Sequence, residues 1–280
     1  MKATLVPVLL AALTASAHAQ PGQASPSFEK VMIVVLENAR YEDALQQPAF
    51  AQLARSGALL MQFHAETHPS QGNYIAMVAG NTYGVRSDDS VDLSVPHIGN
   101  LLDASSKTWK AYLEAYPGDC FLGSASGKYV RKHNPFASFR DIQADPSRCS
   151  AHLVDASTLA DDVSAGTLPT FSLYIPDVDN SGHDTGIGNA NRWFSQVFGP
   201  LMKDPRFMKG MLLVVTFDES AGDKDNHVFT ALYGDSVIPG SHTDAAYDHY
   251  SILRTIENTL GTGTLRQRDA SARPITGVWK

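Results

Sequence analysis

Runs of consecutive apolar residues predict the strands of this chain. Residues 31–36 (VMIVVL) and 211–217 (MLLVVTF) are apolar almost throughout rather than at alternate positions. Such runs are typical of strands that are buried on both faces, as in a parallel sheet. Shorter runs predict further strands at residues 108–113, 170–175 and 228–233.

Apolar residues at helical spacing predict helices between these strands. We expect helices at residues 50–60, 74–78, 97–102, 190–202 and 250–260, the last ended by Gly261. Strands that alternate with helices indicate an α/β fold. The expected architecture is a three-layer sandwich around a mainly parallel central sheet.

Residues 1–19 have the pattern of a secretory signal peptide. A lysine precedes a short apolar stretch at 5–13, and Ala17 and Ala19 have the spacing of a cleavage site. The alternative is a buried N-terminal helix. We expect cleavage after Ala19, a secreted or periplasmic protein, and a single domain over residues 20–280.

Composition and charge exclude several functional classes. The chain has 280 residues, of which 43% are hydrophobic and 18% charged, so it can bury a large core. Its net charge of -7 argues against a general nucleic-acid binder, which would show a basic stripe. No apolar run beyond the N-terminus has the length of about eighteen residues that a membrane span needs, so we expect no stable membrane insertion. The oligomeric state stays open.

The chain has two cysteines, Cys120 and Cys149, in a loop-rich segment at residues 115–150. In an oxidising compartment such a pair most simply forms one disulfide. A catalytic thiol is the alternative. Two cysteines alone do not make a thiolate zinc site.

Polar clusters follow three of the predicted strands. Glu37 and Asn38 follow the first strand, residues 177–184 follow another, and Asp218 and Glu219 follow the strand at 211–217. Ligands of open α/β sheets bind at the carboxyl ends of the strands. These clusters are therefore expected to converge on one site.

Ser70 is the candidate nucleophile, because it lies where a loop enters a helix. The free N–H groups of a first helical turn can hold a phosphate or an oxyanion beside such a hydroxyl. A metal or a base would be needed to activate it. The alternative is an ordinary N-cap serine.

Three other clusters offer metal ligands or general bases. Asp179 and His183 form an Asp-x-x-x-His pair that suits a divalent ion, although a simple turn would have the same residues. Asp218 and Glu219 are candidate ligands or bases, or else a strand end that meets solvent. His249 opens the last helix as a ligand, a phosphate contact or a surface histidine.

Several common catalytic motifs are missing from the sequence. It contains no P-loop, no G-x-G-x-x-G and no G-x-S-x-G. NTPase, dinucleotide-binding and α/β-hydrolase interpretations therefore lack support.

Six segments, taken in order, resemble the phosphoesterase family of the alkaline-phosphatase-like superfamily. They are VLEN at 35–38, HPSQGNYI at 68–75, YVRKHNPF at 129–136, NSGHDT at 180–185, TFDE at 216–219 and HYSILRTIE at 249–257. The family includes bacterial and fungal acid phosphatases and phospholipases C. The resemblance is strongest to the acid-phosphatase branch, and it implies an alkaline-phosphatase-like fold.

The resemblance implies a role for each matching residue. Ser70 would form a phosphoserine intermediate. Glu37, Asn38, Asp218 and Glu219 would surround a divalent metal ion, whose identity and number stay open.

The same resemblance supplies the facing wall of the pocket. Asn73 would hold a phosphate oxygen. His183 would act as a ligand or as the acid that protonates the leaving group, with either Asp184 or Asp179 as its partner, and Asp179 is also a candidate metal ligand.

Three further side chains would contact the phosphate or shape its pocket, namely Lys132, His133 and His249. The leading hypothesis is a secreted acid phosphatase that hydrolyses small phosphate monoesters. One alternative is a phospholipase C that acts on phospholipid head groups. Another is a non-catalytic exoprotein that binds phosphate or metal.

Overall fold

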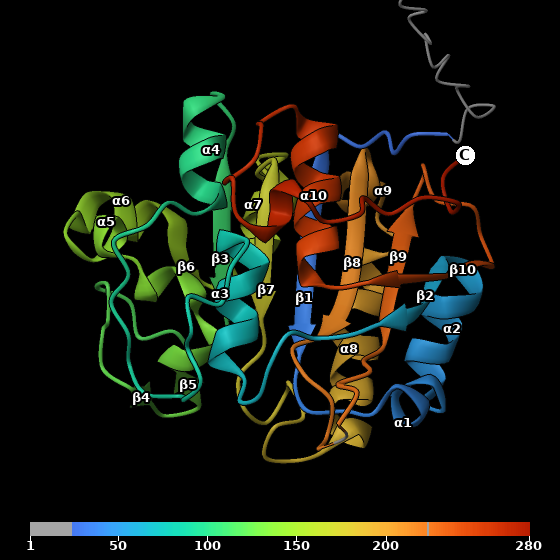
Figure 1. The fold of residues 1–280 in the computed structure, drawn as a ribbon, viewed down its shortest axis with the longest axis horizontal. Coiled ribbons are helices and arrows are strands. Elements are labelled where there is room, and N and C mark those ends of the chain that lie inside the picture. The colour runs from blue at the N-terminus through green and yellow to red at the C-terminus, as the bar shows by residue number, and fades with distance from the viewer. Residues whose placement is uncertain (1–23, 223) are drawn as a thin grey trace, which may run out of the picture.

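The computed structural model describes residues 24–222 and 224–280, so the predicted signal peptide lies outside the described residues. An eight-stranded sheet forms the centre, in the order β10-β2-β9-β8-β1-β7-β3-β6 (Figure 1). Its strands are β1 (Lys30–Leu36), β2 (Ala58–Phe63), β3 (Trp109–Leu113), β6 (Leu153–Asp155), β7 (Phe171–Ile175), β8 (Met211–Phe217), β9 (Thr230–Gly234) and β10 (Ser241–Tyr247). A separate hairpin consists of β4 (Ala125–Ser126) and β5 (Tyr129–Val130).

The sheet is mainly parallel, as the sequence predicted. β1 pairs in parallel with β7 and β8, and Ile33 lies opposite Leu173 on one side and Val214 on the other. β9 runs antiparallel to both of its neighbours, β2 and β8. The central strands are buried along almost their whole length, which explains their unbroken apolar sequences.

Helices cover both faces of the sheet and complete a three-layer α/β sandwich. They are α1 (Tyr41–Leu45), α2 (Pro48–Ser56), α3 (Gln71–Ala79), α4 (Ile98–Ala104), α5 (Arg140–Gln143), α6 (Pro146–His152), α7 (Leu159–Ala165), α8 (Ile187–Leu201), α9 (Pro205–Met208) and α10 (His249–Leu260). Figure 1 shows α3, α4 and α10 in front of the strands and α8 behind them. No helix in the described ranges is both long enough and apolar enough to cross a membrane.

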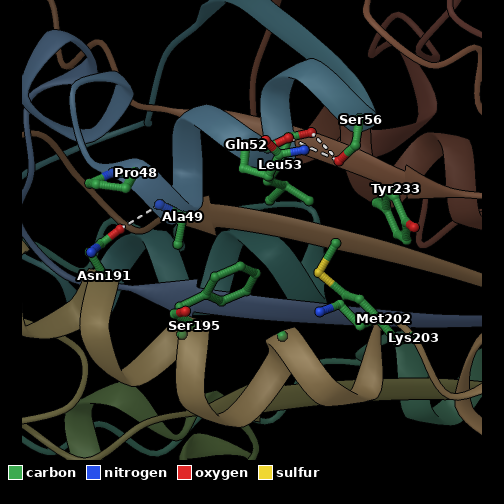
Figure 2. A pocket seen from close by; sticks show the side chains of 12 residues that line it. Pro48, Ala49, Gln52, Leu53, Ser56, Asn191, Ser195, Met202, Lys203 and Tyr233 are labelled. Carbon is green, nitrogen blue, oxygen red and sulfur yellow. Dashed lines mark hydrogen bonds between the residues drawn. The ribbon is translucent and has the colours of Figure 1, made fainter.

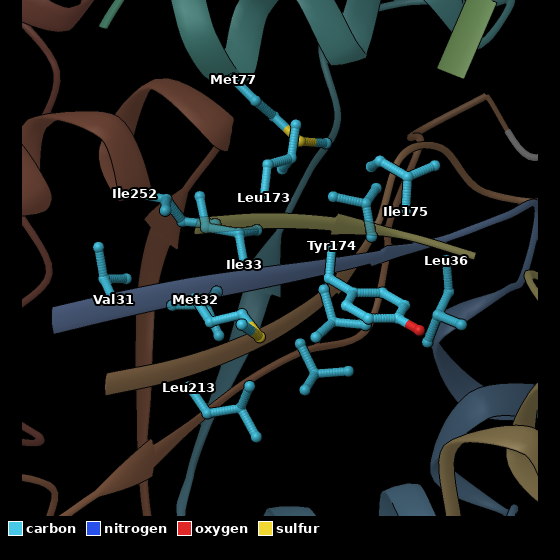
Figure 3. Packing of buried hydrophobic residues seen from close by; sticks show 14 of the residues in the cluster. Val31, Met32, Ile33, Leu36, Met77, Leu173, Tyr174, Ile175, Leu213 and Ile252 are labelled. Carbon is cyan, nitrogen blue, oxygen red and sulfur yellow. The ribbon is translucent and has the colours of Figure 1, made fainter. Parts of the chain in front are cut away.

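Side chains of the central strands alternate between the two layers of the core. Figure 3 shows Ile33 and Leu173 on the same side of the sheet as Met77 of α3. Tyr174 points to the other side, where its ring packs edge-on against Phe198 of α8 at 5.1 Å. The core therefore holds α3, and with it the start of that helix, against the sheet.

The predicted helix at residues 50–60 is wrong in its last part. α2 ends at Ser56, and β2 begins two residues later. Gly57 makes this change possible, because a Cβ there would lie 2.1 Å from the Leu232 carbonyl oxygen of β9. Only glycine lets the backbone pass so close to a neighbouring strand.

The predicted disulfide is present between Cys120 and Cys149, whose Cα atoms are 5.8 Å apart. It closes the loop-rich segment between β3 and β6. Two short 3₁₀ turns lie within that segment, at Arg131–His133 and Pro135–Ser138. The first of these turns carries two of the predicted site residues.

A groove of about 450 Å³ lies between α2 and α8 (Figure 2). The Ala49 N–H donates to Asn191 Oδ1 at 2.8 Å and joins the two helices at one end. The lining is mostly apolar, and Lys203 is the charged side chain in it. The groove therefore lacks the carboxylates and imidazoles that phosphate-ester chemistry uses.

Candidate active site

The ends of β1 and β8 place three acidic side chains next to one another. The strands are parallel neighbours, and Leu36 lies opposite Phe217. Glu37 and Asp218 are therefore adjacent at the carboxyl edge of the sheet, and Glu219 follows. All three are buried.

Ser70 lies at the start of α3 and points at these acids. Its Oγ is 3.2 Å from Glu37 Oε2 and 3.2 Å from Glu219 Oε1. The side chain is 1% exposed and makes no capping bond to its own helix. Ser70 is thus not an ordinary N-cap serine, and its hydroxyl is held between two carboxylates.

Asn38 and Tyr74 complete the shell around the carboxylates. Asn38 donates from its backbone N–H to Asp218 Oδ1 at 3.4 Å and from Nδ2 to Glu37 Oε2 at 3.2 Å. Tyr74 donates from its hydroxyl to Glu37 Oε1 at 2.5 Å. Asn38 has a φ of 47°, a left-handed conformation that asparagine tolerates better than most residues.

The electrostatics of this cluster fit a divalent cation. Burial raises the pKa of Glu37 to about 8. Burial and the nearby charges of Glu37 and Glu219 raise the pKa of Asp218 well above its usual range. Asp218 Oδ2 is buried without a hydrogen-bond partner among the described residues. A hard cation would bind carboxylate oxygens that are buried close together and lack hydrogen-bond partners.

A group of basic side chains, here called the basic wall, lies next to Glu37. The amine of Lys132 lies 2.8 Å from Asp88 Oδ2 and 3.2 Å from His183 Nε2. The other ring nitrogen of His183 lies 2.7 Å from Asp184 Oδ1. Asp184 is therefore the partner of His183, which answers the choice that the sequence left open.

His133 lies between the wall and the carboxylates. Its Nε2 is 3.1 Å from Glu37 Oε1, and its ring stacks on Tyr74. Burial and the charges of Lys132 and His183 hold the pKa of His133 well below its usual range. Ligand atoms of Glu37, His133 and His183 lie within 4.8 Å of one another, so this triad is a second candidate for holding a metal ion.

Asp179 does not reach the site, contrary to the expectation that it ligates a metal. Its carboxylate pairs with Lys128, and it is about one-third exposed. The reason lies in the turn after β7, where Asp177 Oδ1 accepts the N–H groups of Asp179 and Asn180. This turn directs Asp179 outward and leaves the inner position to His183.

Asn73 also differs from its expected role as a phosphate ligand. Its Oδ1 accepts the N–H groups of Glu66 and Thr67, both at 3.0 Å, and its Nδ2 donates to the Thr67 carbonyl at 2.8 Å. The amide therefore fixes the loop that leads into Ser70. Asn73 therefore positions the serine through this loop.

His249 also differs from its expected role as a phosphate contact. It is fully buried, with Nδ1 2.5 Å from Glu66 Oε2 and Nε2 3.1 Å from the Phe217 carbonyl. Burial opposes its charge, but Glu66 and the Phe217 carbonyl raise the pKa of His249. With both ring nitrogens committed, His249 braces the end of β8 beneath Asp218 and is out of reach of a phosphate.

His68 is a pocket residue to which the sequence analysis gave no role. Its Nδ1 lies 2.5 Å from Glu219 Oε2, and its side chain is 42% exposed. It therefore contacts the same carboxylate as Ser70, from a partly exposed position. Its position directly before the Pro69-Ser70 step was the one signal available in the sequence.

Glu114 was missed as well, although it organises the loop that carries His183. It accepts hydrogen bonds from the Tyr174 hydroxyl and the Trp193 indole through Oε1, and from the Asp177 N–H and Asn180 Nδ2 through Oε2. These four donors lie between 2.7 and 3.1 Å from the carboxylate. A single acid after a strand carries no motif, so the sequence gave no reason to select it.

The same loop is joined to the carboxylate cluster through the backbone. The Glu37 N–H donates to the Ser181 carbonyl at 3.1 Å. Glu114, through Asn180, therefore holds a segment that touches Glu37 on one side and presents His183 on the other.

Comparisons with known proteins agree with this geometry. The sequence model of the Phosphoesterase family matches residues 34–262. A phosphate-repressible acid phosphatase of Penicillium chrysogenum is 33% identical over 90% of this chain and 64% of its own length. A phosphatidylinositol-3-phosphatase of Mycobacterium tuberculosis is 33% identical over 98% of this chain and 93% of its own length. The chain thus spans about three-fifths of the length of the fungal acid phosphatases that it matches.

Solved structures agree on the fold. A protein of the alkaline phosphatase superfamily from Vibrio parahaemolyticus superposes with a TM-score of 0.63 at 13% identity, covering 90% of this chain and 71% of that one. The lipoteichoic acid synthase LtaP of Listeria monocytogenes gives a TM-score of 0.58 at 12% identity, covering 87% and 76%. The α/β sandwich is therefore the alkaline-phosphatase-like fold.

Proposed function

The chain belongs to the phosphoesterase family, and from this membership and the pocket around Ser70 we propose that it is a secreted acid phosphatase that hydrolyses phosphate monoesters. The observation that carries the proposal is the buried serine hydroxyl held between Glu37 and Glu219, with Lys132 and His183 next to Glu37. A nucleophile, proton acceptors and a cationic wall are the parts that phosphoryl transfer needs.

In the first step Ser70 Oγ bonds to phosphorus as the bond to the ester oxygen breaks. The hydroxyl proton passes to Glu219, 3.2 Å away, because Glu37, whose pKa is raised to about 8, already holds a proton in mild acid. Lys132 and His183 lie next to Glu37, where they would offset the charge of the phosphate oxygens. His183, oriented by Asp184, supplies the proton that the departing alkoxide requires.

In the second step water attacks the phosphoserine. His183, which gave its proton to the leaving group, takes one from the water, and the serine oxygen recovers a proton from the carboxylate that received it. Phosphate is released and the pocket returns to its initial state.

Glu37, Asn38, Asp218 and Glu219 are the residues that would hold a divalent cation. Bound there, the cation would neutralise the buried carboxylates and polarise the phosphate. Asn38 contributes a neutral side chain and keeps Glu37 oriented through its own hydrogen bond.

A phosphorylated inositol lipid is a second candidate substrate. The phosphatidylinositol-3-phosphatase to which the chain is similar is matched over nearly its whole length, unlike the longer fungal enzymes. Removal of that phosphate is still hydrolysis of a monoester. The relatives reported above are phosphatases, so the phospholipase C alternative is not favoured.

Phosphate release from p-nitrophenyl phosphate tests the proposal. Wild type, Ser70→Ala and Ser150→Ala are compared from about pH 4 to about pH 9, with and without EDTA. Ser150 lies exposed on α6 and serves as the matched control. We expect Ser70→Ala to lose at least about a thousand-fold in kcat while the control keeps it. Equal activity of Ser70→Ala and wild type would exclude the serine mechanism, and full activity in EDTA would exclude a required cation.

A further inference from the structure

A second pocket adjoins the candidate active site. It has a volume of about 340 Å³ and lies between the loop after β2, the return segment after α3, the start of α10 and the segment at Arg268. α3 and α10 lie on the same face of the sheet (Figure 1). The mechanism proposed above makes no use of this pocket.

Two of its walls lead directly into the active site. Thr67 lines the pocket three residues before Ser70. Arg86 lines it two residues before Asp88, which holds Lys132 at 2.8 Å. Asp88 Oδ1 also accepts the N–H of Gln71, the residue after Ser70, at 3.1 Å. Two residues of chain span at most about 7 Å, so the Arg86 backbone lies within about 7 Å of Asp88 at the edge of the active site.

The pocket contains two cationic side chains, Arg86 and Arg268, and the charge of Arg268 acts on the Tyr250 hydroxyl that lines the same pocket. Both are exposed, and within the described ranges neither guanidinium has a hydrogen bond or an ion pair. Arg131, by contrast, is buried against Asp92 and three backbone carbonyls. A guanidinium is suited to bidentate binding of phosphate or carboxylate, and these two have that capacity unused.

The acidic residues of the pocket already have donors. Both oxygens of Glu66 accept from His249, through its backbone N–H and its ring. Asp248 Oδ1 accepts the N–H and the hydroxyl of Ser251 as the cap of α10. The Glu66 charge is also balanced by His249, whose pKa is raised. Asp248 is thus the remaining negative charge against two arginines.

We propose that this pocket is a subsite for a second anionic group of the substrate. The substrate class is then a phosphate monoester that carries another phosphate or carboxylate a few bonds away, bound with the ester at Ser70 and the second anion at Arg86 and Arg268. The inference rests on the proposed function for the identity of the first site. It adds a reason for selectivity among phosphate esters that the catalytic groups alone do not provide.

Equilibrium binding of two hydrolysis-resistant probes tests the subsite. Hexylphosphonate has one anionic end, and hexane-1,6-diyl bisphosphonate has two. Calorimetric titration of the wild-type protein with each probe gives the ratio of their Kd values. Two identical ends alone give an advantage of about two-fold, whereas an occupied subsite is expected to give about ten-fold or more. The excess should shrink at high salt, because the arginines are exposed.

Variants locate the effect. The double variant Arg86→Ala/Arg268→Ala is expected to bring the ratio down to about two. Arg55→Ala is the matched control, since Arg55 is an exposed arginine of α2 that contacts Gln52, and it should keep the wild-type ratio. Because both arginines in the double variant are exposed, their removal leaves the core intact.

The outcomes separate this inference from the proposed function. A wild-type ratio near two, a ratio that survives in the double variant, or no binding of either probe overturns the subsite. A ten-fold ratio that the double variant loses supports it, whether or not the protein turns over hexyl phosphate. Failure to release phosphate from hexyl phosphate would overturn the proposed function and leave the binding result standing.

Discussion

The buried carboxylates beside Ser70 make stability depend on a divalent cation in a way that varies with pH. Burial raises the pKa of Glu37 to about 8, and burial also raises the pKa values of Asp218 and Glu219. In the cation-free folded protein these groups keep protons that the unfolded chain releases above about pH 4.5. Folding then takes up protons, so cation-free stability falls as the pH rises from about 4.5 towards 8.

The size of the cation effect follows from the same pKa. A cation at one hundred times its Kd stabilises the folded state by about 2.7 kcal/mol. To bind, the cation must displace at least the proton of Glu37. Its apparent affinity therefore increases about ten-fold for each unit by which the pH rises, up to about pH 8. At a fixed cation concentration the stabilisation therefore grows by about 1.4 kcal/mol per pH unit between about pH 6 and 8.

Thermal unfolding with Mg²⁺ or Mn²⁺ titrations at about pH 6, 7 and 8 measures this effect. For a protein of this size, 2.7 kcal/mol corresponds to a rise in Tm of about 5–10 °C. Asp218→Asn removes one charge and is expected to abolish most of the rise. Asp244→Asn, at an exposed position of β10, is the control and should respond like wild type.

Two results would refute the reasoning. One is a cation-induced rise in Tm that does not vary with pH. The other is an undiminished rise in Asp218→Asn. A rise that survives in Asp218→Asn but disappears in His133→Ala would place the cation at the triad of Glu37, His133 and His183 instead.

Three further predictions concern residues outside the carboxylate cluster. Glu114→Gln is expected to lower kcat about ten-fold with little change in KM, because an amide cannot accept hydrogen bonds from four donors. Glu114→Asp should restore part of the rate, and steady-state kinetics measure both variants. Glu257→Gln is expected to raise the free energy of unfolding by about 1–2 kcal/mol at pH 8 but not at pH 4, because burial and Asp269 raise the pKa of Glu257 to about 9. Urea unfolding at both pH values measures this difference. Replacing Cys120 and Cys149 by serine is expected to lower the free energy of unfolding by about 3–4 kcal/mol, given their separation of 29 residues, in the same assay.

Each of these has an outcome that contradicts it. A rise in KM with kcat intact would show that Glu114 serves substrate binding and not the placement of the His183 loop. Equal stabilisation by Glu257→Gln at both pH values would mean that its proton is not involved. Unchanged stability of the double serine variant would show that the segment between β3 and β6 is fixed by its packing alone.

Much of the fold was predictable because its central strands have no exposed face. β1 and β8 are buried on both sides, so their sequences are apolar throughout and give an unambiguous signal. β10 was missed because it lies at the sheet edge, where SHTDAAY is half polar and Tyr247 is its one buried residue. The helix predicted at 50–60 was too long because α2 ends before Gly57. The close approach of Gly57 to β9 is a tertiary contact that the local sequence does not reveal.

The location of the candidate site was more predictable than the hydrogen-bond partners of its side chains. Ser70, Glu37 and Asp218 follow sheet strands or begin a helix, and parallel topology brings such positions to one edge. The partners of Asn73 and His249 were not predictable. Both have side chains suited to phosphate, but both form hydrogen bonds with the segment at Glu66 and Thr67 instead. That segment is distant from His249 in sequence.

The central place of β1 has a consequence for how the protein is made. β1 is the first strand within residues 24–222 and 224–280, but its two neighbours begin only at Phe171 and Met211. During synthesis an apolar strand with both edges open must therefore wait until most of the chain has emerged. Such long-range parallel pairing folds slowly, so the nascent chain exposes an aggregation-prone segment for longer than a protein with local contacts would. Ser70 likewise gains its partner Glu219 only at that late stage, so no N-terminal fragment that ends before β8 can assemble the pocket.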